Sequence, residues 1–227
     1  MTRWTLLSAT ALLVCVASGC GTTHHTVTTP STTTAAAQMH LTIFRVTNGV
    51  LEAQDVAVPQ TQGVAGAALE ALGIDGSVTI ANGSATVTDD GATDQQVAEI
   101  VYTLTQFSAV ERVDVAGKTG LTRVDEALYV PPILLESPVG PNPLPTTFHV
   151  KGTASVFEGT LVLTLKMNNG KTIRQTVTAT AGAPDLGTFD ATVHATANGP
   201  ATLSLYAPSA QNGKPQHEVS EQLHIGS

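Results

Sequence analysis

Cysteine is almost absent from this 227-residue chain, which contains only Cys15 and Cys20. Cys15 lies in an uncharged apolar run over residues 4–16, which is too short to cross a bilayer comfortably. If this run is removed as part of a leader, one cysteine remains, and neither a disulfide nor a cysteine-based zinc site can form. We therefore expect a fold that depends on its apolar core alone.

Basic residues are also scarce, with 10 Lys and Arg against 18 Asp and Glu and a formal net charge of −8. Loss of Arg3 with a leader would make the balance more acidic still. Nucleic acids and anionic lipid headgroups are bound through basic surfaces. We therefore expect no nucleic-acid partner, and membrane attachment only through a lipid.

The first 38 residues have the pattern of an export signal and a tether. The apolar run leads into Ala17-Ser18-Gly19 directly before Cys20. Small residues before a cysteine are typical of a bacterial lipoprotein signal, in which residues 1–19 are removed and Cys20 is acylated, for example with palmitate. An ordinary secretory signal is the alternative. Residues 20–38 are Thr-rich and aperiodic, which predicts a flexible spacer. We expect a protein anchored to the extracytoplasmic face of the cell membrane.

Residues 39–128 repeat one pattern of elements. Alternating runs flank Asn48-Gly49 and again Asn82-Gly83, and Asn-Gly between such runs predicts a type I′ hairpin. An amphipathic helix follows each hairpin, the first ending at Gly73 and the second beginning with a capping box at Thr93. The turn glycines Gly49, Gly83 and Gly117 are spaced 34 residues apart, so we expect a closing hairpin at Gly117. The pattern predicts an α+β domain of two hairpin–helix units plus a closing hairpin, with one helix face on one sheet face.

Three stretches of this domain resemble a known family. They are "AALEAL" (67–72), "ATV" (85–87) and "VYTLTQFSAVERVDVAGK" (101–118). Together they are similar to the GerMN domain, which is named for sporulation and spore germination and occurs in bacterial envelope lipoproteins. The resemblance covers about residues 40–125, although this chain has Gly-Ile-Asp-Gly where the family usually has Gly-Pro. It implies no catalytic residue.

Residues 129–227 have a different pattern. Six prolines in residues 129–145 predict an extended linker with a short strand at 133–135, leading into a second domain. Six or seven short alternating runs follow, which predicts an antiparallel two-sheet sandwich. "VKGTASVFEGTLVLTL" (150–165), "GTFDATV" (187–193) and "LSLYAPSAQNGK" (203–214) resemble the immunoglobulin-like domain of bacterial spore-germination proteins, which typically follows a GerMN domain.

No motif of the chain predicts catalysis, a metal or a cofactor. There is no Gly-x-Ser-x-Gly elbow, and Asp89-Asp90 before Gly91 is ordinary turn chemistry. The histidines of the second domain lack the spacing of zinc ligands.

Three residues are candidate partner contacts. Tyr102 and Gln106 would form an exposed ridge on the second helix, unless Tyr102 covers the sheet edge. Glu158 would be a polar anchor, unless it only fixes a turn with Phe157 plugging the core.

These observations favour a non-enzymatic, lipid-anchored envelope protein that binds a protein partner or a peptidoglycan-associated component through its two domains. The alternative is a solute-binding lipoprotein or an enzyme with a cleft between the domains and the Pro-rich linker as a hinge. A junction lined by convergent polar groups would favour the alternative. A junction of apolar contacts would favour the binding protein.

Overall fold

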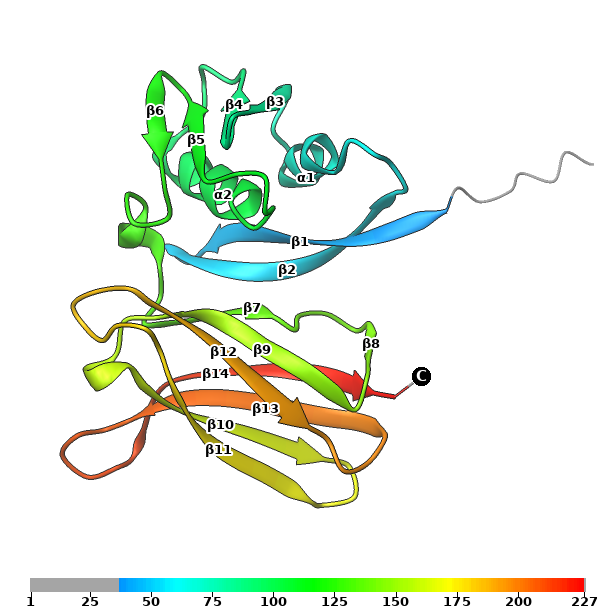
Figure 1. The fold of residues 1–227 in the computed structure, drawn as a ribbon, viewed down its shortest axis with the longest axis vertical. Helices are drawn as coiled ribbons and strands as arrows, with labels where there is room; N and C mark the ends of the chain where they lie inside the picture. Colours follow the sequence, from blue (N-terminus) through cyan, green and yellow to red (C-terminus); the bar gives the residue numbers. More distant parts are fainter. Residues whose placement is uncertain (1–36, 227) are drawn as a thin grey trace, which may run out of the picture. The chain divides into compact units, whose positions relative to one another are not determined.

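The computed structural model describes residues 37–226 (Figure 1). Its first half follows the predicted order of two hairpin–helix units and a closing hairpin. The elements are β1 (Gln38–Thr47), β2 (Val50–Pro59), α1 (Val64–Leu72), β3 (Val78–Ala81), β4 (Ser84–Val87), α2 (Asp94–Leu104), β5 (Arg112–Val115) and β6 (Lys118–Leu121).

The predicted turns and caps are confirmed. Both residues of each Asn-Gly turn have positive φ, 53° and 85° at Asn48-Gly49 and 51° and 76° at Asn82-Gly83, as a type I′ turn requires. Gly73 ends α1 in the left-handed conformation. The Thr93 side chain caps α2, and the Gln96 side chain accepts from the Thr93 backbone. Local chemistry therefore fixes where these elements begin and end.

The layering differs from the single helix-on-sheet layer that the repeat predicts. β1 and β2 form a two-stranded sheet of their own, while the other strands form a second sheet in the order β3-β4-β5-β6. The two helices lie between these sheets (Figure 1). The reason is that α2 is apolar on more than one side, so it packs against two layers at once. Its buried residues include Val97, Ala98, Ile100, Val101 and Leu104.

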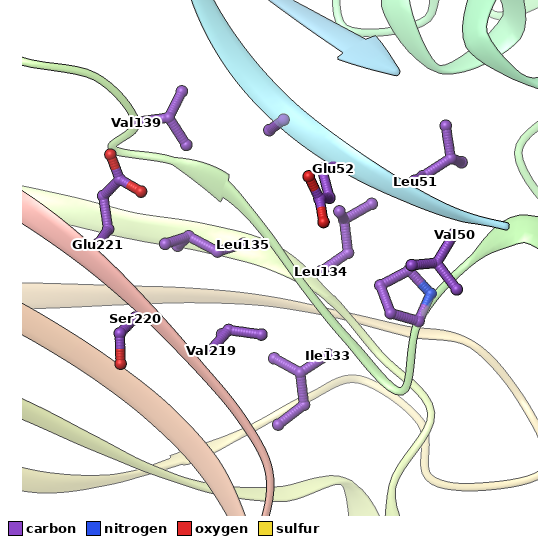
Figure 2. A pocket seen from close by; sticks show the side chains of 12 residues that line it. Val50, Leu51, Glu52, Ile133, Leu134, Leu135, Val139, Val219, Ser220 and Glu221 are labelled. Carbon is purple, nitrogen blue, oxygen red and sulfur yellow. The ribbon is translucent and has the colours of Figure 1, made fainter. Parts of the chain in front are cut away.

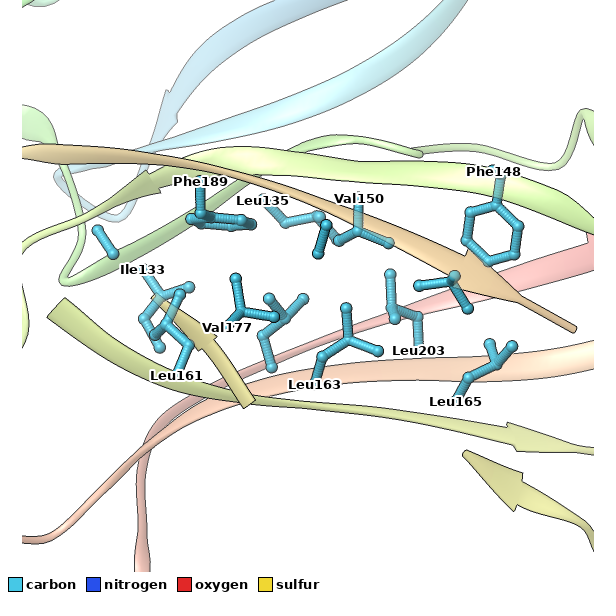
Figure 3. Packing of buried hydrophobic residues seen from close by; sticks show 14 of the residues in the cluster. Ile133, Leu135, Phe148, Val150, Leu161, Leu163, Leu165, Val177, Phe189 and Leu203 are labelled. Atoms are coloured by element: carbon cyan, nitrogen blue, oxygen red, sulfur yellow. The ribbon is translucent and has the colours of Figure 1, made fainter. Parts of the chain in front are cut away.

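The second half is a sandwich of two sheets, in the orders β12-β9-β7 and β11-β10-β13-β14-β8. Alternate residues of the facing strands meet in its core, among them Leu161, Leu163 and Leu165 of β10 (Figure 3). The strands are β7 (Ile133–Ser137), β8 (Pro143–Leu144), β9 (Thr147–Ala154), β10 (Thr160–Met167), β11 (Thr172–Thr178), β12 (Gly187–His194), β13 (Gly199–Pro208) and β14 (Pro215–Ile225).

The Pro-rich segment contains the predicted short strand, which runs as β7, and this part of the segment belongs to the sandwich instead of forming an extended linker. β7 pairs with β9 along its length, and β8 pairs in parallel with the end of β14. The prolines flank β7 instead of interrupting it, so its ladder can form. Ile133 and Leu135 face the sandwich core, whereas Leu134 faces the first half of the chain. β7 is therefore buried on both faces, which explains its uninterrupted apolar run.

Candidate partner-binding surface

The junction between the two halves is closed by apolar contacts, one ion pair and a hydrogen bond from Asn142 to the Asp55 carboxylate at 3.3 Å. Leu134 of β7 packs against Leu51 of β2 and against the Phe44 and Tyr102 rings. Beside this cluster the Arg123 guanidinium lies 2.7 Å from the Glu136 carboxylate. The same guanidinium lies 4.8 Å from the centre of the Tyr102 ring. An apolar junction of this kind was the feature expected of a binding protein.

Tyr102 is not an exposed contact, and that prediction is wrong. Its side chain is 0% exposed, and its hydroxyl lies 3.4 Å from the Arg123 carbonyl oxygen, to which it donates. Burial raises the pKa of the phenol above its ordinary value. The prediction assumed that α2 has a solvent side at this point. The β1–β2 sheet and β7 cover that side, so Tyr102 joins the junction core instead.

The Gln106 side chain is also held by hydrogen bonds within the fold. Its Nε2 donates to the carbonyl oxygens of Thr42 at 2.8 Å and Thr103 at 2.6 Å, and the residue is half-buried. It borders a polar hollow of about 610 Å³ that also contains the ion pair of Arg123 and Glu136. The charges of Arg123 and Glu136 satisfy each other in this hollow, and Ser137 and Lys151 also belong to its polar lining. Gln106 therefore ties α2 to β1.

A groove of about 420 Å³ lies between β2, β7 and β14 (Figure 2). Its lining is mostly apolar, from residues such as Leu51, Leu135 and Val219. Glu221 borders it, but its carboxylate accepts a hydrogen bond from the Gly140 backbone at 2.9 Å. Glu52 and Ser220 are the other polar residues of the lining. Small-molecule pockets combine apolar walls with a few placed polar groups, so this groove is where the solute-binding alternative would have its site.

A different surface stands out by its exposed apolar side chains. Four large hydrophobic residues are exposed among residues 37–226, and three of them lie on neighbouring loops: Val124 (72% exposed), Leu128 (86%) and Phe157 (64%). The fourth is Ile80 (40%), in β3. Val124 also lines a hollow of about 310 Å³, together with Ala127, Val130, Pro132, Ser155, Pro184, Asp185 and Leu186. Leu128 and Phe157 are not in this lining but follow the lining residues Ala127 and Ser155 by one and two positions. We call these three side chains and the hollow the apolar loop surface.

Val124 and Leu128 are presented by an ordered turn between β6 and β7. The Asp125 carboxylate accepts from the backbone N–H of Thr122 at 2.8 Å and from its hydroxyl at 2.7 Å. These hydrogen bonds lower the pKa of Asp125. A 3₁₀ turn at Ala127–Tyr129 follows. The backbone is therefore held in place while the two apolar side chains face solvent.

Phe157 does not plug the sandwich core, so that interpretation of the Phe-Glu-Gly motif is wrong. The neighbouring Val156 is buried in the core instead. After Phe157 the chain reverses through Glu158, with φ of 52°, and Gly159, with φ of 60°. This confirms that Glu158 lies in a tight turn, with its carboxylate exposed. The reversal leaves Phe157 on the outside.

The backbone of the Phe157 turn packs closely against the backbone of residues 181–183. A Cβ at Gly159 would come within 2.6 Å of the Ala181 carbonyl oxygen, and one at Gly182 within 2.6 Å of the Gly159 nitrogen. The Ala183 N–H donates to the Val156 carbonyl oxygen at 2.8 Å. Glycine is required for such close backbone packing. Phe157 is therefore an aromatic side chain displayed on a preorganised loop, which reduces the entropy lost on binding.

The sequence pointed to Glu158 but not to Val124 or Leu128. Their spacing of four residues in "TRVDEALYV" resembles one face of a helix, which normally predicts burial. In the structure the segment makes only a single 3₁₀ turn. Its apolar side chains consequently have no layer to cover them.

Within residues 37–226, no group of three or more His, Cys, Asp or Glu side chains is placed to hold a metal ion. His149 and Asp190 form one exposed pair, with the ring Nδ1 2.6 Å from the carboxylate. None of the helices in the described part of the chain is long and apolar enough to cross a membrane. Cys20, the predicted lipidation site, lies outside these residues.

The second half of the chain matches a known family. None of the curated proteins matches the chain. Residues 133–214 match the family model Gmad2, described as the immunoglobulin-like domain of bacterial spore germination. This stretch begins at β7, ends just before β14 and includes the Phe157 turn. The resemblance of the second half is thereby confirmed: from residue 133 to residue 214 the chain carries an immunoglobulin-like domain of the spore-germination type.

Proposed function

We propose that this chain is a non-enzymatic binding protein of the bacterial cell envelope, and that it binds a protein partner through the apolar loop surface. The observation that carries the proposal is the exposure of Val124, Leu128 and Phe157 on two ordered loops that are joined by a hydrogen bond from the Ser155 N–H to the Pro132 carbonyl oxygen at 3.0 Å. Exposed apolar side chains that lie near one another often mark interaction sites. A rigid aromatic residue at such a site is a typical binding hot spot.

The sequence supplies the cellular setting of the proposal. Residues 1–19 would be a lipoprotein signal, Cys20 the acylated residue, and residues 20–38 a spacer to the membrane. Residues 39–128 would be a GerMN-like α+β domain, followed by the immunoglobulin-like domain. The matched family at 133–214 supports this order, because the two domains typically occur together in envelope lipoproteins. The partner would then be another extracytoplasmic protein.

The chemistry of the surface favours a protein over a cell-wall glycan. Glycans present mainly hydroxyl groups, which require several polar side chains aimed at them. The lining of the hollow has one hydroxyl side chain, Ser155, and its Oγ donates to the Pro184 carbonyl oxygen at 3.3 Å. The Ser155 hydroxyl is therefore engaged with the backbone, and Asp185 is the other polar side chain of this lining. Apolar side chains of a protein match this lining better.

The proposal can be tested with a photo-crosslinking amino acid placed at position 128 or 157 of the full chain in intact cells. The matched control carries it at position 80, because Ile80 is also an exposed large hydrophobic residue but lies in β3. We expect one protein to be cross-linked from 128 and from 157 and not from 80. Phe157→Ala should abolish the cross-link from position 128.

Two outcomes would contradict the proposal. One is the same set of proteins recovered from all three positions, which would show unspecific proximity at the membrane. The other is no protein adduct from 128 or 157 together with a tightly bound small molecule in the purified chain. That second result would favour the solute-binding alternative.

A further inference from the structure

We infer that the partner's contacting segment is cationic as well as apolar: one or two large apolar side chains flanked by lysine or arginine. This inference rests on the proposed function and specifies the chemistry of the partner at the same surface. It is carried by the carboxylates that surround the apolar loop surface.

Three exposed acidic residues border the apolar side chains. Asp185 lines the hollow itself, Asp125 adjoins Val124, and Glu158 adjoins Phe157. Among the described residues none of these three carboxylates takes part in an ion pair. A fourth acidic residue, Glu126, follows Asp125 directly and is 7% exposed. An apolar centre with an acidic rim is complementary to an apolar segment with basic flanks.

The neighbouring cations do not cancel this charge. Lys118 lies 2.8 Å from the Asp94 carboxylate. Arg123 pairs its guanidinium with Glu136, next to the Phe44 and Tyr102 rings. Each is therefore matched by a carboxylate of its own. The rim keeps an excess of negative charge, which would steer a basic segment toward it.

The size of the hollow limits what can enter it. Its volume of about 310 Å³ is near the lower end of the range for small-molecule pockets, roughly 300–1,000 Å³. Its walls are short or branched apolar side chains such as Val130 and Leu186. It therefore suits one or two side chains of a partner, with Phe157 and Leu128 packing against the surrounding partner surface.

Charge also argues against the two other occupants of an exposed apolar surface. A symmetric pair of copies would place each acidic rim against its own counterpart, because a two-fold interface is self-complementary. Like charges brought together across an interface are unfavourable. An anionic membrane would be repelled by the same rim, since lipid surfaces attract basic segments. A basic partner alone satisfies both the apolar centre and the rim.

The inference can be tested on the purified full chain with three synthetic peptides that share a Trp-Leu core and differ in their flanks, which are Lys, Ser or Glu. Binding is followed through the NMR methyl signals of Val124 and Leu128 and by fluorescence anisotropy. We expect the Lys-flanked peptide to bind about tenfold more tightly than the Ser-flanked one at low salt, as two or three exposed ion pairs would give. The difference should shrink as salt screens the charges.

Substitutions distinguish the contribution of the acidic residues to peptide binding from the contribution of the apolar contact. Glu158→Gln with Asp185→Asn should remove most of the Lys preference, whereas Glu218→Gln, an exposed acid on β14, should not. Phe157→Ala should weaken the binding of the Lys-flanked and Ser-flanked peptides by the same factor. Equal binding of all three peptides, or an unchanged Lys preference in the double variant, would overturn the cationic partner while leaving the apolar surface intact. Concentration-dependent dimers abolished by Leu128→Ser, or binding to phosphatidylglycerol vesicles abolished by the same change, would also overturn it.

Discussion

The Arg123 guanidinium lies 2.7 Å from the Glu136 carboxylate and also stacks near the Phe44 and Tyr102 rings. The pair joins the segment after β6 to β7, and both side chains are largely shielded from solvent. It therefore connects the two halves of the chain beside an apolar cluster.

Glu136→Gln should lower the free energy of unfolding by about 1–3 kcal/mol, because a shielded charged group loses its partner. The measurement is urea denaturation of the full chain. The exposed pair of Lys118 and Asp94 serves as the control, and Lys118→Met should have a much smaller effect. Equal effects of both substitutions would contradict the account of the junction.

Glu126 should make stability depend on pH. Burial is the main cause that raises the pKa of its carboxyl in the folded chain. A raised folded pKa means that the folded state binds the proton more tightly, so this residue favours folding at low pH and opposes it as the pH rises through the folded pKa. Glu126→Gln should therefore raise the free energy of unfolding at pH 7, and the gain should disappear near pH 4.

Urea denaturation at the two pH values measures this difference. Glu218→Gln, at an exposed position of β14, is the control and should show little change at either pH. A Glu126→Gln variant that is less stable at pH 7 than the natural chain would show that the carboxylate makes a favourable contact, contrary to the prediction.

Gly159→Ala should destabilise the sandwich by more than about 2 kcal/mol, because its φ is 60° and a Cβ would meet the Ala181 carbonyl oxygen at 2.6 Å. The matched control is Gly170→Ala. Gly170 also has positive φ, 81°, but a Cβ there would meet nothing within 4 Å, so only about 1 kcal/mol of backbone strain is expected. Thermal or urea unfolding of both variants checks the difference. Equal losses would mean that the close backbone packing under Phe157 is not required.

Cys20→Ser should move the protein from the membrane fraction to the soluble extracytoplasmic fraction, because the acyl chains would be absent. Cys15→Ser is the control and should leave the distribution unchanged, since residue 15 would be removed with the leader. Membrane association that survives Cys20→Ser would rule out the predicted lipid anchor.

The turns and caps could be predicted because they depend on a few adjacent residues. Asn48-Gly49 needs only its own backbone to form the hairpin, and Thr93 needs only Gln96 to cap α2. The alternation of β10 likewise predicts a strand with one buried face. Local patterns of this kind were enough to predict the sandwich.

The surface could not be predicted, because exposure depends on which layers meet. Tyr102 lies on a helix side that would be open if one sheet covered α2, and it is buried because β7 approaches from the other half of the chain. Phe157 is a large apolar residue of the kind that is usually buried, and a left-handed turn at Glu158 and Gly159 directs it outward. Neither outcome is encoded within a few residues of the position concerned.

In the proposed function Phe157 anchors the protein partner, and the affinity of the partner that is cross-linked from position 128 measures its contribution. We expect Phe157→Ala to weaken this affinity by at least about tenfold, as loss of a hot-spot aromatic does. Ile80→Ala, at the exposed hydrophobic position in β3, should change it less than about twofold, since most residues outside a hot spot contribute little. Equal affinity of the Phe157→Ala variant and the natural chain would contradict the account.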